Sequence, residues 1–247
     1  MNRIKDYGQL AFDIDRWLQD YYYFHAIKAF VVGVSGGIDS AVVSTLCART
    51  EHPTYVLTMP LHSKKENTEL SDAHAKALDD KYPNVKVVNI DLTETYDKFM
   101  LNVDDTFTGS QLANANTKSR LRMVSLYQVA GSVGGIVVGT GNKVEDYGIG
   151  FYTKYGDGGV DIAPIADLYK TEVRELGWHL GVMNEIIDAP PTDGLWDDGR
   201  NDEDQIGATY AELEEAMENG TGKAVDILYK FNRQNRHKME PIPTFKL

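Results

Sequence analysis

Short apolar runs alternate with amphipathic segments along most of this chain. Runs rich in branched and aromatic residues predict strands at residues 31–34, 54–59, 85–90 and 135–139. Helical spacing of apolar positions predicts helices at residues 39–49 and 67–81, from residue 93, and at residues 112–131. Strands that alternate with helices indicate a parallel sheet covered on both faces. The predicted fold class is therefore α/β: a doubly wound, mostly parallel, Rossmann-like sheet.

A further helix is predicted ahead of the first strand. Its apolar residues share one face, which is typical of a helix packed on a core. The run YYYF at residues 21–24 adds more aromatic surface than such packing requires, so two interpretations stay open: core packing, or contact with a second subunit. The predicted buried face consists of Leu10, Ile14, Trp17, Leu18 and Tyr21.

Length and composition set broad limits on what the protein is. The 247 residues, 42% of them hydrophobic, suffice for one domain spanning residues 1–247 without disulfides. The net charge of −12 counts against nucleic-acid partners, which call for a basic surface. No apolar run approaches the roughly 20 residues of a membrane span, and the amino terminus lacks an apolar signal core. We therefore expect a cytoplasmic protein with neither a membrane nor a nucleic-acid partner.

The chain contains a single cysteine, Cys47, in an apolar helical stretch. A buried, inert thiol is the expected role of such a residue. One cysteine also excludes a Cys-rich metal centre and the paired cysteines of thiolating enzymes.

Two loops interrupt the regular pattern. Residues 148–161, GIGFYTKYGDGGVD, are rich in glycine, and a loop of this kind inside a compact domain is more often functional than decorative. Residues 197–204, DDGRNDED, are nearly all charged, and we expect a mobile, solvated segment or a lid there.

The strongest local motif is VVGVSGGIDS at residues 31–40. A buried strand, a turn of Ser and Gly and a helix start follow one another, so backbone amides and the positive helix end can meet a phosphate chain. Ser35 and Ser40 add hydroxyl donors, and Asp39 adds a carboxylate for a phosphate-bound Mg²⁺. The motif therefore predicts a nucleotide site.

Other interpretations of this motif lead to different protein classes. A Walker A loop requires a Lys after the glycines, and none is present. Residues 33–37, GVSGG, match a hydrolase nucleophile elbow with Ser35 as nucleophile, and His179 and His237 lie downstream as bases. That interpretation leaves Asp39 and Ser40 unexplained. A purely structural strand-to-helix turn is the third possibility.

A second motif, GTGNKVE at residues 139–145, follows the fourth predicted strand. In a parallel sheet it lies at the same edge as the first motif, so Glu145 can supply a second carboxylate near Asp39. Two carboxylates with phosphate oxygens suit Mg²⁺. A lone Glu at a helix start is also favoured by the helix dipole alone.

The segment SGGIDS at residues 35–40 resembles the pyrophosphate loop of the ATP pyrophosphatase superfamily. These enzymes cleave ATP to AMP and diphosphate while they adenylate an oxygen of the substrate. Members include NAD, GMP and argininosuccinate synthetases and tRNA-thiolating enzymes. Six further segments, in the family's order, make the chain similar to the ammonia-dependent NAD synthetases: residues 116–123, 139–145, 151–161, 164–170, 189–192 and 235–238.

The resemblance implies a role for individual residues. It implies that catalysis depends on Ser35, Asp39, Ser40 and Lys170, and that Mg²⁺ binds Asp39 and Glu145. The implied ATP contacts are Gly33, Val34, Ser35, Gly36, Gly37, Ile38, Asp39, Ser40, Thr140, Lys170 and Thr192. The implied contacts to the second substrate, deamido-NAD, are Arg120, Lys154, Asp161, His237 and Lys238.

Each of these segments also has a simpler local interpretation. Arg120 and Arg122 suit a solvated helix face, His237 and Lys238 a charged tail, and Lys154 an exposed loop. The interval from Glu145 to Lys154 is one residue longer than in common family members. Residues 193–196, DGLW, also depart from the family pattern.

The resemblance implies that ATP and ammonia convert deamido-NAD to NAD, AMP and diphosphate, through an adenylated intermediate, in a homodimeric ligase. Ammonia has to be free, because Cys47 is a poor nucleophile for hydrolysing glutamine. The alternatives are an enzyme that amidates or adenylates another small carboxylate, a serine hydrolase built on Ser35, and a non-enzymatic binding module.

Overall fold

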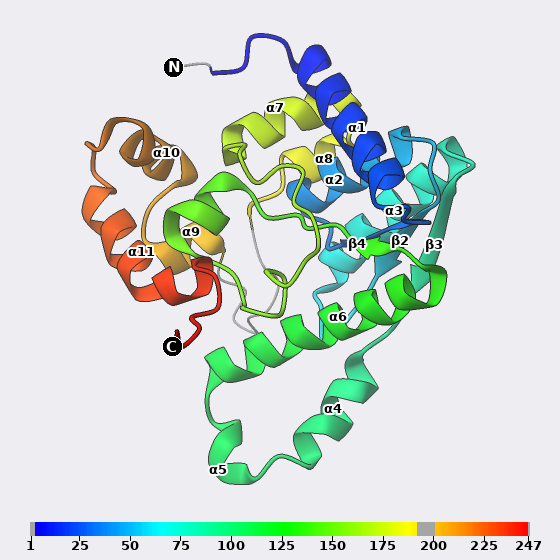
Figure 1. Ribbon diagram of the computed structural model, residues 1–247. Helices are drawn as coiled ribbons and strands as arrows, with labels where there is room; N and C mark the ends of the chain where they lie inside the picture. Colours follow the sequence, from blue (N-terminus) through cyan, green and yellow to red (C-terminus); the bar gives the residue numbers. More distant parts are fainter. Residues whose placement is uncertain (1–2, 192–200, 247) are drawn as a thin grey trace.

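The computed structural model describes residues 3–191 and 201–246, and these contain a four-stranded parallel sheet in the order β3-β2-β1-β4 (Figure 1). The strands are β1 (Phe30–Val34), β2 (Thr54–Thr58), β3 (Val85–Asn89) and β4 (Ile136–Val137). Phe30 pairs with Thr54 on one side and with Ile136 on the other. The predicted α/β fold class is confirmed.

The order of the strands creates a crevice between β1 and β4. From β1 the chain moves outward through β2 to β3, and then returns to the opposite side of β1 to form β4. Ligands in open α/β sheets bind beyond the carboxyl ends of the strands where the winding reverses in this way. The loops after β1 and β4 therefore face each other across the crevice.

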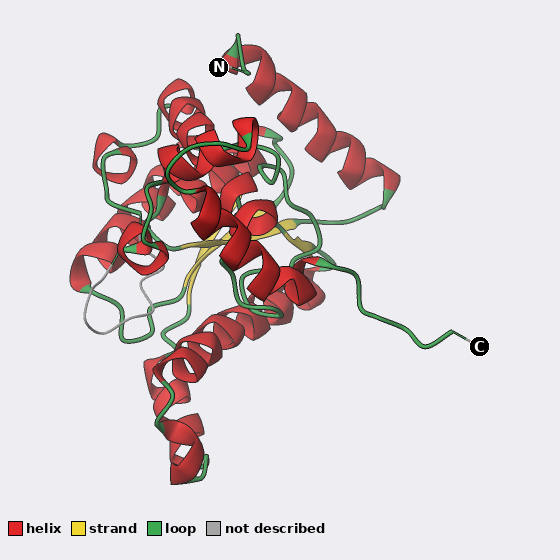
Figure 2. Cartoon of the chain, turned by 90° about the vertical axis from the view of Figure 1, so that its left-hand side faces the viewer, coloured by secondary structure: helices red, strands yellow, loops and turns green. Residues whose placement is uncertain are grey.

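Helices cover both faces of the sheet because its strands are apolar on both sides (Figure 2). Val32 of β1 faces a cluster with α1 (Tyr7–Phe24), α2 (Ile38–Arg49), α3 (Lys65–Lys81), α7 (Lys170–Leu180) and α8 (Asn184–Ile187). Val31 points the opposite way, toward α4 (Thr93–Leu101) and α6 (Gln111–Val133). The short helix α5 (Asp105–Thr108) precedes α6.

A third apolar cluster lies apart from the sheet and joins the carboxyl-terminal helices to the loop after β4. It packs Tyr169 and Tyr210 between a π-helix (Val144–Ile149), α10 (Tyr210–Asn219) and α11 (Val225–Met239). The short α9 (Asp202–Ile206) contributes Ile206. Figure 1 shows α9, α10 and α11 grouped on one side of the molecule. This cluster forms the outer wall of the crevice.

The predicted helices and strands are close to those observed, with one error in the first helix. Ile14 and Leu18 of α1 are buried, but Trp17 is 43% exposed, so its assignment to the buried face is wrong. Ala11 takes its place in the core, because it is one turn from Ile14. No described helix has both the length and the apolarity that crossing a membrane demands.

The charged stretch at residues 197–204 also departs from expectation where it can be seen. Residues 197–200 lie outside the described residues. Asn201 caps α9, and Asp202 within it is only 5% exposed. The prediction of a solvated segment is therefore wrong for Asp202, because its carboxylate turns inward to Tyr210.

The loop after β4 leads into the π-helix Val144–Ile149. π-Helices are rare and mostly span a single turn, which their i→i+5 hydrogen bonds make wider than an α-helical turn. Here the amide of Gly150 donates to the carbonyl of Glu145, and Gly150 ends the helix with a φ of 62°.

Candidate active site

The loop after β1 is closed by its two serines. Ser40 Oγ donates to the carbonyl of Gly37 at 2.9 Å and accepts from the amide of Ser35 at 3.2 Å. Ser35 Oγ lies 3.2 Å from Ser40 Oγ and accepts from the amide of Gly37 at 3.3 Å. These bonds curl residues 35–40 around the amino terminus of α2, which is the geometry that amide binding of phosphate requires.

Gly36 is the residue on which this curl depends. Its φ is +88°, and a Cβ there would lie 2.7 Å from the carbonyl oxygen of Asn67. Both the left-handed backbone and the collision disfavour any side chain at this position.

Gly36→Ala is expected to destabilise the protein by more than the ~1–2 kcal/mol of a left-handed alanine and to weaken ATP binding. Gly181→Ala is the matched control, because Gly181 has a φ of +74° and open space around its Cβ position. Urea unfolding and calorimetric titration with ATP measure the two effects. Equal losses of stability in the two variants would show that the contact with Asn67 is unimportant.

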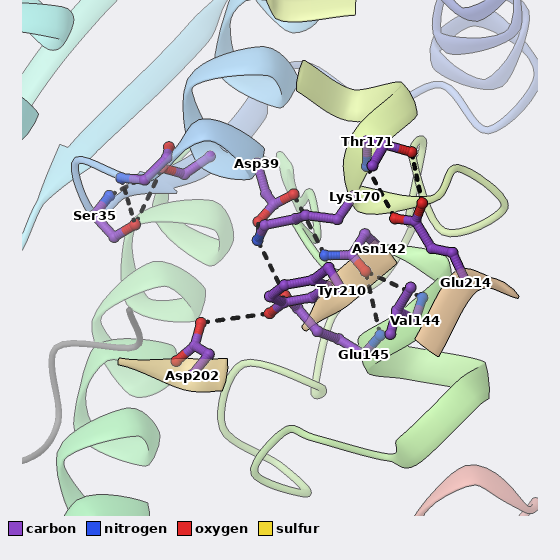
Figure 3. Close-up of polar contacts among 12 residues, drawn as sticks. Ser35, Asp39, Asn142, Val144, Glu145, Lys170, Thr171, Asp202, Tyr210 and Glu214 are labelled. Atoms are coloured by element: carbon purple, nitrogen blue, oxygen red, sulfur yellow. Dashed lines mark hydrogen bonds and ion pairs between the residues drawn. The ribbon is translucent and has the colours of Figure 1, made fainter. Parts of the chain in front are cut away.

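Two carboxylates and one ammonium group meet beside this loop (Figure 3). Lys170, the first residue of α7, bonds Asp39 Oδ2 with its Nζ and lies 3.1 Å from Glu145 Oε1. All three side chains are largely buried. Burial by itself would lower the pKa of Lys170, but Asp39 and Glu145 together outweigh it and raise that pKa. Lys170 is therefore a charged ammonium that holds both carboxylates at one point.

Asn142, a residue that sequence reasoning missed, connects the two carboxylates to the backbone. Its Oδ1 accepts from the amides of Val144 at 3.1 Å and Glu145 at 3.2 Å, and thereby caps the π-helix. Its Nδ2 donates to Asp39 Oδ1 at 3.4 Å. The signal in the sequence was an Asn immediately before a helix start, which is typical of a cap.

Tyr210 was also missed, although it touches the same cluster. Its hydroxyl donates to Glu145 Oε1 at 2.6 Å and lies 3.4 Å from Asp202 Oδ2. Lys170 Nζ lies 4.9 Å from the centre of its ring. Burial, followed by the charges of Glu145 and Asp202, raises the pKa of Tyr210, so the phenol stays protonated. No local motif marks Tyr210, because its partner lies 65 residues away.

A cavity of about 870 Å³ opens over this cluster and accommodates most of the predicted site. On the nucleotide side it is lined by Gly33, Val34, Ser35, Gly36, Gly37, Ile38, Asp39, Ser40, Thr140, Glu145 and Lys170. On the other side it is lined by Arg120, Lys154, His237 and Lys238. Thr192 lies outside the described residues, so its contact with ATP stays a prediction.

The predicted second-substrate residues bring three distant segments together. Arg120 of α6 donates to the carbonyl of Lys154 at 3.2 Å, and Lys154 Nζ donates to the carbonyl of His237 at 3.1 Å. Lys238 of α11 donates to the carbonyls of Gly150 and Tyr152. The glycine-rich loop is thus held between α6 and α11 by cationic side chains. The roles of these residues toward substrate stay predictions.

Arg122 and Asp161 make contacts other than those expected from the sequence. Arg122 donates to the carbonyl of Met59 at 3.1 Å, so the solvated-face interpretation is wrong for this residue. Asp161 accepts from the amide of Val137 at 2.7 Å and from the hydroxyl of Tyr127 at 3.0 Å. It is not among the residues that line the cavity, and it holds the far end of the glycine-rich loop against β4.

Two further carboxylates line the cavity without having been predicted. Asp157 accepts from Ser119 Oγ at 2.7 Å and from the amide of Thr153 at 3.0 Å. Asp146 is buried, and burial together with Glu145, Asp157 and Asp39 raises its pKa to about 7. Both carboxyl groups line the cavity, and the raised pKa of Asp146 leaves that group partly protonated near neutral pH.

The serine hydrolase interpretation is not supported by the contacts of Ser35. Its hydroxyl bonds Ser40 and Gly37, whereas the serine–histidine pair of the described chain is Ser44 with His74, at 2.9 Å. Both members of that pair are buried between α2 and α3, away from the cavity. Cys47 is buried as predicted, and burial raises the pKa of its thiol.

Comparison with known proteins identifies the family of this chain. The sequence model of the NAD synthase family matches residues 11–242. The NH(3)-dependent NAD(+) synthetase of Finegoldia magna is 35% identical over 243 residues, covering 98% of this chain and 97% of the relative. That of Methanococcoides burtonii is 42% identical over 194 residues, covering 78% and 72%.

Solved structures give the same result. The NMN synthetase of Francisella tularensis has a TM-score of 0.89 and 32% identity, covering 99% of this chain and 100% of that one. The NH3-dependent NAD synthetase of Campylobacter jejuni has a TM-score of 0.78 and 24% identity, covering 98% and 100%, and shares the fold. With a family model that matches residues 11–242 and a matching fold, the chain belongs to the NAD synthase family.

Proposed function

We propose that this chain is an ammonia-dependent ligase that uses ATP to amidate deamido-NAD, giving NAD, AMP and diphosphate. One observation carries the proposal: a single cavity brings two groups of residues together. The first group is the phosphate loop with Asp39, Glu145 and Lys170, and the second consists of the cationic residues of α6, the glycine-rich loop and α11. The names of the curated relatives support the same reaction. Residues 1–247 would act as one catalytic domain.

Activation of the acid is the first step of the proposed mechanism. A carboxylate oxygen of the substrate attacks the α-phosphorus of ATP. The bond between the α-phosphorus and the oxygen that bridges it to the β-phosphorus breaks, and diphosphate leaves. Negative charge grows on the α-phosphoryl and on the departing group. We expect the loop of residues 35–40 with its Ser35 and Ser40, together with the ammonium of Lys170, to stabilise that charge. Catalysis then rests on positioning and electrostatics.

Transfer to ammonia is the second step. Ammonia attacks the acyl carbon of the mixed anhydride, the bond to the AMP oxygen breaks, and the amide loses a proton. AMP is a far better leaving group than oxide, which explains the use of ATP. Arg120, Lys154, His237 and Lys238 would hold the dinucleotide, and Asp161 would support them by fixing the glycine-rich loop against β4. Thr140 and Thr192 would add to ATP binding.

Magnesium would bind Asp39 and Glu145. Both carboxylates already converge on one cation, the ammonium of Lys170, so their positions fit a metal that takes few protein ligands and several phosphate and water oxygens. When bound, Mg²⁺ neutralises charge on the triphosphate and its departing diphosphate.

A second candidate substrate is the mononucleotide. The Francisella tularensis enzyme, whose fold is very similar over the full length of both chains, is an NMN synthetase. The same chemistry on nicotinate mononucleotide gives NMN. Both candidates carry the same reacting carboxylate and differ in the adenylate half.

The test is a comparison of kcat/KM for deamido-NAD and nicotinate mononucleotide with Mg-ATP and ammonium. We expect the greater value for deamido-NAD, with AMP released only when the acid is present. A greater value for the mononucleotide would favour the second candidate. Glutamine should not replace ammonium, and equal turnover with glutamine would overturn the ammonia-dependent assignment.

The protein would act as a cytoplasmic homodimer. Exposed aromatic side chains on α1 support a subunit contact: Phe12, Trp17, Tyr23 and Phe24. Sedimentation velocity of the purified protein distinguishes a dimer from a monomer.

A further inference from the structure

Tyr210 is a buried tyrosine whose hydroxyl reaches into the charged cluster. It begins α10, is 4% exposed, and packs its ring with Ile206 and Leu213 in the third apolar cluster. A protein that needed only to fill this space would use Phe, since a buried hydroxyl requires a partner. The partner chosen here is the carboxylate of Glu145 (Figure 3).

The hydroxyl and Lys170 bind the same oxygen of Glu145. Tyr210 donates to Oε1 at 2.6 Å, and Lys170 Nζ lies 3.1 Å from that atom. Within the described residues, Oε2 has no hydrogen bond of its own. The carboxylate is therefore fixed by one oxygen and keeps the other for an incoming group.

Tyr210 is itself held firmly. Its amide donates to Glu203 Oε1 at 2.9 Å, and Thr209 in front of it forms a capping box with Glu212. Four residues further on, Glu214 accepts from both the amide and the hydroxyl of Thr171. Because Thr171 follows Lys170, these bonds tie α10, which carries the phenol of Tyr210, to the start of α7, which carries the ammonium of Lys170.

From this arrangement we infer that Tyr210 is a positioning residue for Glu145, which orients the carboxylate so that its second oxygen can bind the metal. The inference rests on the proposed function, in which Glu145 is a metal ligand. Groups that orient a metal ligand commonly contribute 10–100-fold to metal affinity or activity. A purely structural phenol would affect stability but not the affinity for metal.

Tyr210→Phe removes only the hydroxyl and keeps the ring against Lys170. We expect Mn²⁺, titrated by electron paramagnetic resonance in the presence of ATP, to bind roughly 10-fold or more weakly to this variant. The turnover at fixed low metal should fall and recover at high metal, while KM for deamido-NAD stays unchanged. The matched control is Tyr169→Phe, since Tyr169 lies in the same cluster with its ring against Arg3.

A double-variant cycle identifies the carboxylate through which Tyr210 acts. In a Glu145→Gln background, Tyr210→Phe should produce little additional loss of Mn²⁺ affinity. Wild-type Mn²⁺ affinity in Tyr210→Phe would overturn the inference while leaving the proposed function intact. Absence of Mn²⁺ binding by the wild-type protein with ATP would instead overturn the metal role, and the inference with it.

Discussion

Asp39→Asn is expected to lower kcat by at least ~10²-fold, the scale of losing one preorganised electrostatic contact. The change keeps the size of the side chain but removes the charge that pairs with Lys170 and would face the metal. Steady-state kinetics with saturating Mg-ATP, ammonium and deamido-NAD measures the effect.

Asp15→Asn is the matched control for this result. Asp15 is a buried carboxylate that accepts two hydrogen bonds from Arg49, at 2.8 and 3.0 Å, and it lies away from the cavity. We expect this variant to lose stability and to keep nearly normal kcat. Near-normal turnover of Asp39→Asn at ordinary Mg²⁺ concentrations would contradict the metal role of Asp39.

Lys170→Met is expected to affect both stability and turnover. Without the ammonium, Asp39 and Glu145 face each other as buried carboxylates with no cation between them. Removing one partner of a buried ion pair commonly costs about 3–5 kcal/mol in the free energy of unfolding. The turnover should fall by ~10²-fold or more, because a charge that would stabilise the departing diphosphate is lost.

Urea unfolding of Lys170→Met with and without Mg²⁺ tests this prediction. Magnesium should restore part of the lost stability, since the two carboxylates then regain a cation. Lys143→Met is the control, because Lys143 forms a surface ion pair with the exposed Asp167, worth at most about 1 kcal/mol. An unchanged unfolding free energy for Lys170→Met would show that the three-residue cluster does not form in solution.

The sheet and its helices were predictable because their signals are local. Strands covered on both faces appear as unbroken apolar runs, and the order of strands and helices leaves few topologies. Trp17 is a position that local spacing predicts wrongly. Its spacing places it on the buried face of α1, but α2 and α7 cover only the part of that face around Ala11, Ile14 and Leu18, and Trp17 stays exposed.

The nucleotide side of the site was predictable for a similar reason. Residues 35–40 and Glu145 follow two strands whose carboxyl ends meet, so sequence position alone brings them together. Tyr210 and Asp202 were not predictable, because the contacts of the Tyr210 hydroxyl with Glu145 and Asp202 join segments that no periodicity relates. Their recognition requires the third apolar cluster, which forms only through tertiary packing.

The ammonium of Lys170 has a consequence for the order in which ligands load. Two carboxylates and one ammonium leave the resting cluster with a single excess negative charge, which repels the triphosphate. A divalent ion that arrives alone is repelled by the ammonium of Lys170, just as the triphosphate alone is repelled by the excess negative charge. When the ion and the nucleotide arrive together, their opposite charges offset both repulsions. Under the proposed metal role, linkage would make each raise the affinity for the other, so metal and nucleotide would bind cooperatively and neither would bind tightly by itself.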